Sequence, residues 1–402
     1  MVLLSSLGRW WRHLRGHSVW SSNVWSVQEL ADVQPLATWV WLTATALVLA
    51  ASSVGHLSRS LLLSLLSLAA VSQRLCAVVE QLTVCCGRAW QEALVQAVLG
   101  KIELVIFSSV ALQRGQLDLA SLALMGSILF SMLTVAGVSL ALAASVSTEL
   151  GFASESLPAS LGVAILAAGA ALFPAFLTMP TCKPGLHRKR YAGCDESDKV
   201  RPLSNWVSGV LLAVYCAWLW SCGTSHTGGG AAVPVSGQRP LARRRAAVLM
   251  VWVLFLAAAA TLVSGAVVTA MTRDLRWWQS RPLVAAVLIP AAVNCGDLTS
   301  AADHALHGRT EAAVRVAVGS AVQVMLCLLP SAVLGAAMHG VPLTFFTLDV
   351  QHALTVLLAT LTTARALADR RASQVKGVAL LGNYAMLAAA FWVEGRTTGE
   401  RL

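Results

Sequence analysis

Long apolar segments recur along the whole chain and limit what it can fold into. Many of them approach the roughly 20 residues that a membrane-spanning helix needs. The 402 residues are 57% hydrophobic and only 12% charged, too few charges to cover the surface of a soluble protein of this length. The segments are rich in Leu, Ala and Val and do not alternate, and a spanning backbone must satisfy its own hydrogen bonds, so helices are favoured over a barrel. We predict an all-α polytopic membrane protein with about 11 transmembrane helices, near residues 36–54, 60–84, 93–113, 117–146, 158–179, 204–221, 246–270, 281–306, 311–338, 344–367 and 374–395.

The positive charge of the chain also fits a membrane protein. The net charge of +10 comes mostly from Lys and Arg in short connections such as Arg243–Arg245, and such residues beside membrane helices set topology. We therefore expect membrane lipid and no nucleic acid as a partner. Residues 1–35 carry Arg9, Arg12 and Arg15 among tryptophans, which predicts a cytosolic interfacial segment. Eleven spans would then place Arg188–Arg190 on the far side, in conflict with the charge rule.

Two acidic residues, Glu103 and Asp297, lie inside apolar segments. An acid at the centre of a membrane helix costs roughly 2.5 to 3.5 kcal/mol on insertion scales, so it is usually retained for an ion or a proton. The alternative for each is a polar packing residue or a side chain that reaches the membrane surface.

The two acids lie in a sequence repeat. The stretch GKIELVIFSSVALQRGQLDLASLALMGSIL from Gly100 resembles VNCGDLTSAADHALHGRTEAAVRVAVGSAV from Val293. Counted from the Ala-Leu pair that follows each acid, Glu103 corresponds to Asp297. Counted back from the later Gly-Ser pairs, Leu104 corresponds to Asp297 instead. We favour Glu103, because one extra residue is more easily absorbed in the turn at 113–118 than inside a helix, where it rotates side chains by about 100°.

A segment rich in Gly, Pro and Arg, residues 222–245, separates the repeats and predicts a flexible linker. We expect a leading helix region at 36–58, a first repeat at 59–221, a second repeat at 246–396 and a tail at 397–402. Five helices per repeat is an odd number, so the second repeat enters the membrane from the opposite side. Binding is expected where inverted repeats meet, near the midplane.

These motifs resemble those of the vacuolar-type calcium/proton exchangers within the calcium/cation antiporter superfamily. The resemblance rests on GKIEL at Gly100 and GSIL at Gly126, and on a second set of residues at matching spacing. That set is Pro290, Asn294, Asp297, Gly319, Ser320, Gln323 and Pro330. The resemblance implies that the two acids coordinate a cation and accept protons alternately. It also implies calcium or another divalent cation as substrate and a vacuolar or other acidic-organelle membrane.

Some residues depart from the family pattern at the site itself. Lys101 replaces an Asn, Val293 a Gly and Leu298 a His, and Asp297 is shorter than the usual Glu. Lys101 has two interpretations: it points away from Glu103 to the membrane surface, or it pairs with Glu103 and occupies the cation position. The alternatives to calcium/proton exchange are a paralogue that has lost transport and an exchanger of altered selectivity, for sodium or manganese.

The candidate ligands are oxygen-bearing side chains, because calcium prefers six to eight oxygens. Small residues such as Gly126 and Gly296 would let the backbone approach closely. His304 is a candidate proton relay or a residue near a helix end, and Cys182 and Cys194 are a candidate disulfide. We find no phosphate-binding loop, dinucleotide motif or hydrolase motif, so we predict a transporter without a cofactor and not an enzyme. The predicted cation ligands are Glu103, Asp297, Asn294, Ser127, Ser320 and Gln323.

Overall fold

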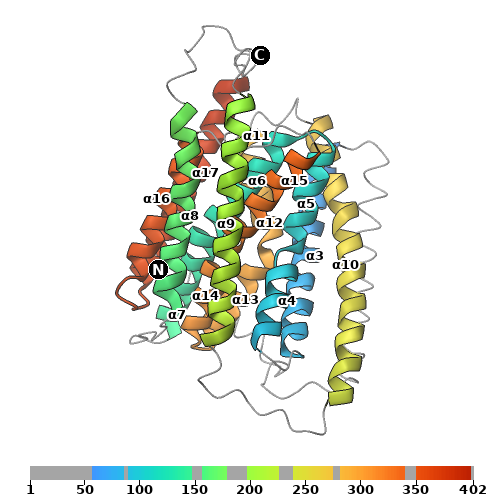
Figure 1. Ribbon diagram of the computed structural model, residues 1–402, viewed down its shortest axis with the longest axis vertical. Helices are drawn as coiled ribbons and strands as arrows, with labels where there is room; N and C mark the ends of the chain where they lie inside the picture. The colour runs from blue at the N-terminus through green and yellow to red at the C-terminus, as the bar shows by residue number, and fades with distance from the viewer. Residues whose placement is uncertain are drawn as a thin grey trace.

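The computed structural model describes residues 57–85, 89–146, 156–178, 197–225, 239–274, 281–339 and 350–399, and all the elements in these ranges are helices (Figure 1). The first half holds α3 (Leu57–Val84), α4 (Ala89–Leu99), α5 (Ile102–Gln113), α6 (Leu117–Leu129), η1 (Phe130–Val135), α7 (Ala136–Val146), α8 (Ser156–Thr178) and α9 (Ser197–Ser225). The second half holds α10 (Arg239–Asp274), α11 (Arg281–Leu283), η3 (Val284–Leu288), α12 (Ile289–Val293), α13 (Cys295–Leu306), α14 (Thr310–Gln323), η4 (Val324–Leu328), α15 (Leu329–Met338), α16 (Val350–Leu367) and α17 (Gln374–Gly399).

The predicted all-α membrane architecture is confirmed. Ten of the eleven expected spans coincide with these helices, and the first, 36–54, lies outside the described residues, as does the segment 1–35. Seven described helices can each cross a membrane by length and composition, and a bent pair gives an eighth. Helices α9 and α10 extend into both ends of the predicted linker, to Ser225 and from Arg239. The linker's middle, like Cys182, Cys194 and Arg188–Arg190, lies outside the described residues.

The two halves repeat one structural unit in opposite directions. In each, a broken helix (α4–α5 or α12–α13) is followed by a tight turn and a helix interrupted by a π-helical segment (η1 or η4). In Figure 1, α4 lies below α5 whereas α12 lies above α13, so the two broken helices run in opposite senses. This matches the inverted repeats that the odd helix count predicts.

The break between α12 and α13 bends the span by 56°. Asn294 leaves helical geometry there, with φ −97° and ψ 15°, and its side-chain amide donates to the carbonyl of Pro290 at 2.7 Å. Pro290 has no backbone N–H to donate, and an Asn side chain that bonds to nearby backbone competes with the helix ladder. In the first repeat the break falls at Gly100 and Lys101.

Glycines bring the broken helices against their neighbours. A Cβ at Gly126 would overlap the carbonyl oxygen of Ala286 and the ring of Pro290, so α6 can approach the second repeat only with Gly at this position. A Cβ at Gly296 would lie 2.5 Å from the Cβ of Cys76, so α13 packs closely on α3. Both contacts enclose the region around the two breaks.

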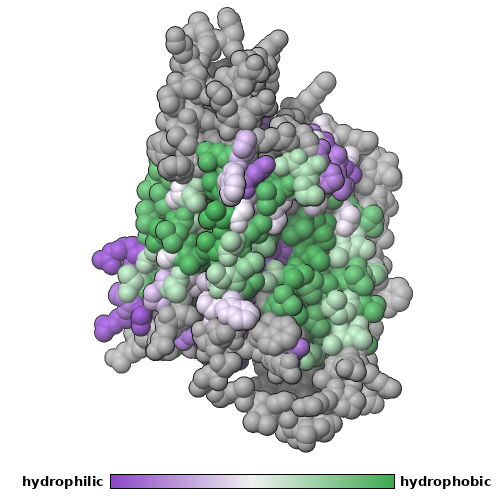
Figure 2. Space-filling view, viewed as in Figure 1, coloured by the Kyte–Doolittle hydropathy of each residue, from purple (hydrophilic) through white to green (hydrophobic). Residues whose placement is uncertain are grey.

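The outer surface of the protein is largely apolar. Figure 2 shows a broad hydrophobic band across the middle of the molecule. On α10, Val251 and Leu254 are each 66% exposed and Leu262 is 59% exposed. A band of this kind is what hydrocarbon contact requires, and it places the breaks of α4–α5 and α12–α13 at membrane depth.

Candidate cation site

The register of the two repeats differs from the one that we favoured on sequence. Helices α5 and α13 both have 12 residues; α5 lies between Lys101 and Arg114, and α13 between Asn294 and His307. The following turns are also equal, with Gly115 at φ +70° and Gly308 at φ +73°. The turn at 113–118 therefore absorbs no extra residue, and our interpretation was wrong on this point.

By position in the helix, Lys101 is the counterpart of Asn294 and Leu104 is the counterpart of Asp297. Leu104 is fully buried. Glu103 precedes this position by one residue, which turns its side chain by about 100° around the helix. The two acids consequently leave their helices in non-equivalent directions.

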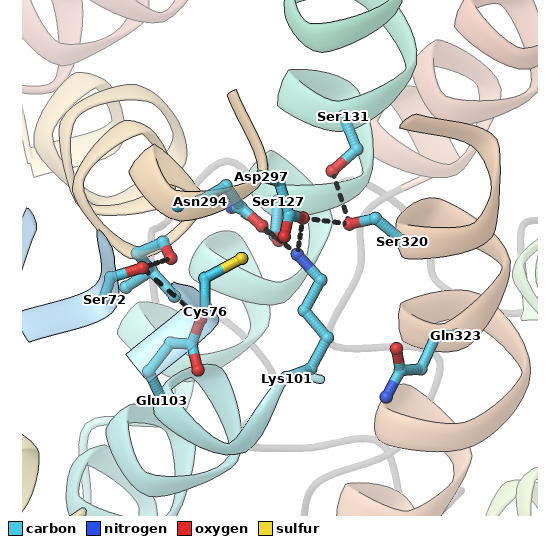
Figure 3. A network of polar contacts seen from close by, with 12 residues as sticks. Ser72, Cys76, Lys101, Glu103, Ser127, Ser131, Asn294, Asp297, Ser320 and Gln323 are labelled. Atoms are coloured by element: carbon cyan, nitrogen blue, oxygen red, sulfur yellow. Dashed lines mark hydrogen bonds and ion pairs between the residues drawn. The ribbon is translucent and has the colours of Figure 1, made fainter. Parts of the chain in front are cut away.

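Lys101 extends into the protein between the two repeats and meets Asp297 (Figure 3). Its Nζ forms an ion pair with Asp297 Oδ2 and donates to Asn294 Oδ1 at 2.5 Å. Only 1% of Lys101 is exposed. The expectation that Lys101 reaches the membrane surface is therefore wrong. The alternative interpretation is correct in placing the ammonium inside the site, but its partner is Asp297 and not Glu103.

Hydroxyl groups complete the surroundings of this ion pair. Ser320 Oγ donates to Asp297 Oδ2 at 2.7 Å, and Ser131 Oγ lies 3.0 Å from Ser320 Oγ. Ser127 Oγ lies 2.8 Å from the amide nitrogen of Asn294. Four predicted ligands, Asp297, Asn294, Ser127 and Ser320, thus form one buried network with Lys101 at its centre.

Glu103 lies at the edge of this network and faces α3. Ser72 Oγ lies 3.3 Å from Glu103 Oε1 and also donates to the carbonyl of Val293, at the end of α12. Figure 3 shows Glu103 on the same side as Ser72 and Cys76, apart from Asp297. The sequence did not single out Ser72, because a Ser among Leu and Ala residues is typical of ordinary helix packing.

Gln323 does not face the acids. Its side-chain amide donates to the carbonyls of Ala97 at 2.9 Å and Gln96 at 3.3 Å, in the last turn of α4. Because the last carbonyls of a helix lack partners within it, Gln323 stabilises the end of α4 beside the first break. It supports the site without contributing an oxygen to the network.

The remaining polar candidates lie away from the ion pair. The Nδ1 atom of His304 is buried and has no hydrogen-bond partner among the described residues. Glu92 and Asp118 lie exposed in the first turns of α4 and α6. Within the described ranges, no group of three or more His, Cys, Asp or Glu residues could hold a metal ion.

A known protein family covers most of the sequence. The family described as Sodium/calcium exchanger protein matches residues 36–222 and 245–393. This chain belongs to that family. The match includes both repeats and all the residues of the buried network, so this exchanger-family protein is a transporter by descent and not an enzyme.

Curated relatives of this exchanger-family protein include plant proteins. It is 26% identical over 343 residues to the putative vacuolar cation/proton exchanger 6 of Arabidopsis thaliana, covering 83% of this chain and 73% of the relative. It is 27% identical over 357 residues to the vacuolar cation/proton exchanger 1a of Oryza sativa subsp. japonica, covering 84% and 75%.

Solved structures share the fold. Native YfkE superimposes with a TM-score of 0.70 at 17% identity, covering 88% of this chain and all but 1% of that one. The H⁺/Ca²⁺ exchanger CAX superimposes with a TM-score of 0.62 at 12% identity, covering 90% and 93%. These matches confirm the predicted fold of the exchanger-family protein.

Proposed function

We propose that this protein is a secondary active antiporter that exchanges a cation for protons across a vacuolar or other acidic-organelle membrane. Its curated relatives are named as vacuolar cation/proton exchangers. Calcium is the cation named for two solved neighbours and is the substrate that the sequence resemblance implies. Whether calcium fits this chain depends on Lys101.

One observation carries the proposal: acids from both repeats are buried beside helix breaks at membrane depth. Glu103 is 3% and Asp297 is 7% exposed, in helices that follow the breaks at Lys101 and Asn294. Intramembrane carboxylates are costly and mark ion or proton pathways, and broken helices at the interface of inverted repeats are the usual place for a transport site.

The proposed mechanism needs both repeats to move around this site. In alternating access, one bundle rocks against the other while the bound ion stays near the midplane. The acids would bind the cation on one side and take up protons on the other, which couples the two movements. The cation is a substrate and not a resident cofactor.

A second candidate function is a family member that no longer transports. Lys101 favours it, because the ammonium already neutralises Asp297 and contacts Asn294. A structural or regulatory paralogue would keep the fold and the ion pair and would move no cation.

Transport assays with purified protein separate these functions. We expect proteoliposomes holding the wild type, under an imposed proton gradient, to take up at least one labelled cation from a panel of calcium, manganese, sodium and potassium. Glu103→Gln and Asp297→Asn should each reduce this uptake toward the level of empty liposomes. Glu311→Gln is the matched control, because Glu311 pairs with Arg315 on an exposed helix face.

Two results would count against the proposal. Uptake no greater than in empty liposomes for all four cations would reject antiport and favour the non-transporting paralogue. Unchanged uptake in both Glu103→Gln and Asp297→Asn would reject the site.

A further inference from the structure

We infer that Lys101 is a tethered cation that restricts this antiporter to monovalent cations, which bind at Glu103. The inference rests on the proposed exchange of cations for protons and names the class of cation. It follows from which ligands Lys101 occupies, from the charge that it contributes and from the surroundings of Glu103.

Lys101 occupies the ligands that a divalent cation would need. Calcium requires six to eight oxygens at about 2.3 to 2.6 Å. The Lys101 ammonium takes Asp297 Oδ2 and Asn294 Oδ1, and Ser320 already donates to the same Asp297 oxygen. A cation of that size cannot share these atoms with an ammonium, because both are positive and need the same space.

Lys101 is also held firmly in place. Its side chain is almost completely buried, and withdrawing it would leave an ammonium and a carboxylate separately unpaired in the interior. Removing one partner of a buried ion pair is strongly destabilising for this reason. Lys101 therefore acts as a fixed part of the site and not as a group that a substrate displaces.

The charges at the site suit one monovalent cation. Lys101 and Asp297 pair with each other, so the site gains one net negative charge when Glu103 releases its proton. A sodium or potassium ion makes this total zero, whereas a calcium ion would leave one positive charge in a low-dielectric interior, where uncompensated charge is costly.

Glu103 offers a separate binding position. Its carboxylate lies beside the Ser72 hydroxyl, which contacts the Val293 carbonyl at the end of α12. Carboxylate, hydroxyl and carbonyl oxygens are the ligands that hard cations prefer. The one-residue shift between Glu103 and the position equivalent to Asp297 separates this group from the Lys101–Asp297 pair.

Three variants test the inference in the proteoliposome assay with sodium, potassium, calcium and manganese. Lys101→Met keeps an unbranched side chain one atom shorter than Lys and removes its charge, leaving two acids for one divalent cation. Lys101→Met combined with Asp297→Asn restores the wild-type total of one negative charge. Lys101→Met combined with Glu103→Gln also leaves one acid, but at Asp297. Size-exclusion profiles in detergent identify any variant that does not fold.

We expect the wild type to exchange sodium or potassium and to show no calcium or manganese uptake above empty liposomes. Lys101→Met should raise calcium or manganese uptake to about tenfold or more above empty liposomes, because the site no longer holds an ammonium that repels a divalent cation. Adding Asp297→Asn should abolish the divalent uptake, and adding Glu103→Gln should abolish it as well, because each double variant leaves a single acid for a divalent cation.

The outcomes distinguish this inference from the proposed function. Calcium or manganese uptake by the wild type above empty liposomes would overturn the inference and leave cation/proton exchange standing. If the wild type moves no cation but Lys101→Met takes up divalent cations, Lys101 blocks the site. This result would also overturn monovalent exchange. Absence of uptake in the wild type and in all folded variants would reject both proposals.

Discussion

At the scale of single residues, the buried ion pair between Lys101 and Asp297 is the feature that sets this chain apart. Neither buried charge would be stable alone, and each is the other's partner. Lys101 also donates to Asn294, and Asp297 also accepts from Ser320. Such pairs contribute little net stability compared with apolar residues, but losing one partner is severe. The pair should therefore behave as a unit.

This coupling is testable by a double-mutant cycle. Lys101→Met and Asp297→Asn should each lower the melting temperature of the detergent-purified protein, because each leaves one buried charge unpaired, at about 3–5 kcal/mol. The double variant should recover most of the loss, since neither member of the pair is then left as an unpaired charge. Losses in the two single variants that simply add in the double variant would show that the two side chains do not form the pair.

At the scale of helices, the equal lengths of α5 and α13 decide where the acids point. Both repeats have a break directly before a 12-residue helix and a glycine turn after it, so a one-residue offset in sequence becomes a rotation and not a longer loop. Leu104 occupies the position that an acid symmetric with Asp297 would take, and Glu103 is turned toward Ser72.

Exchanging the two neighbours tests this register. Glu103→Leu combined with Leu104→Glu keeps the composition but turns the carboxylate by about 100° around α5, away from Ser72. We expect cation exchange to fall to the level of Glu103→Gln in protein that elutes as a folded species. Exchange at the wild-type rate would show that the direction of the acid does not matter.

The sequence predicted these helices well and their side-chain directions less well. Apolar length indicated the spans, and the repeat pointed to both acids, because each signal depends on local residue type. The partner of Lys101 depends on a contact between residues nearly 200 positions apart, and the role of Ser72 depends on α3 packing against α12 and α13. Neither follows from spacing within one segment. Gln323 likewise fits the family motif, but its side-chain amide donates a hydrogen bond to the Ala97 carbonyl at the end of α4.

At the scale of the whole molecule, two oppositely oriented repeats meet around buried polar groups inside an apolar exterior. The glycine contact of α6 with the second repeat and the insertion of Lys101 from the first repeat into the second both lie at this meeting point. A rocking motion of one repeat against the other would therefore act directly on the cation ligands.

Coupling between cation and proton is the central claim, and a pH-sensitive dye sealed inside proteoliposomes tests it most directly. An inward gradient of the cation that the uptake panel identifies, with no initial pH difference, should drive protons out and make the lumen alkaline. The wild type should do this, and Glu103→Gln should not. A lumenal pH that stays constant while labelled cation enters through the wild type would contradict proton-coupled exchange.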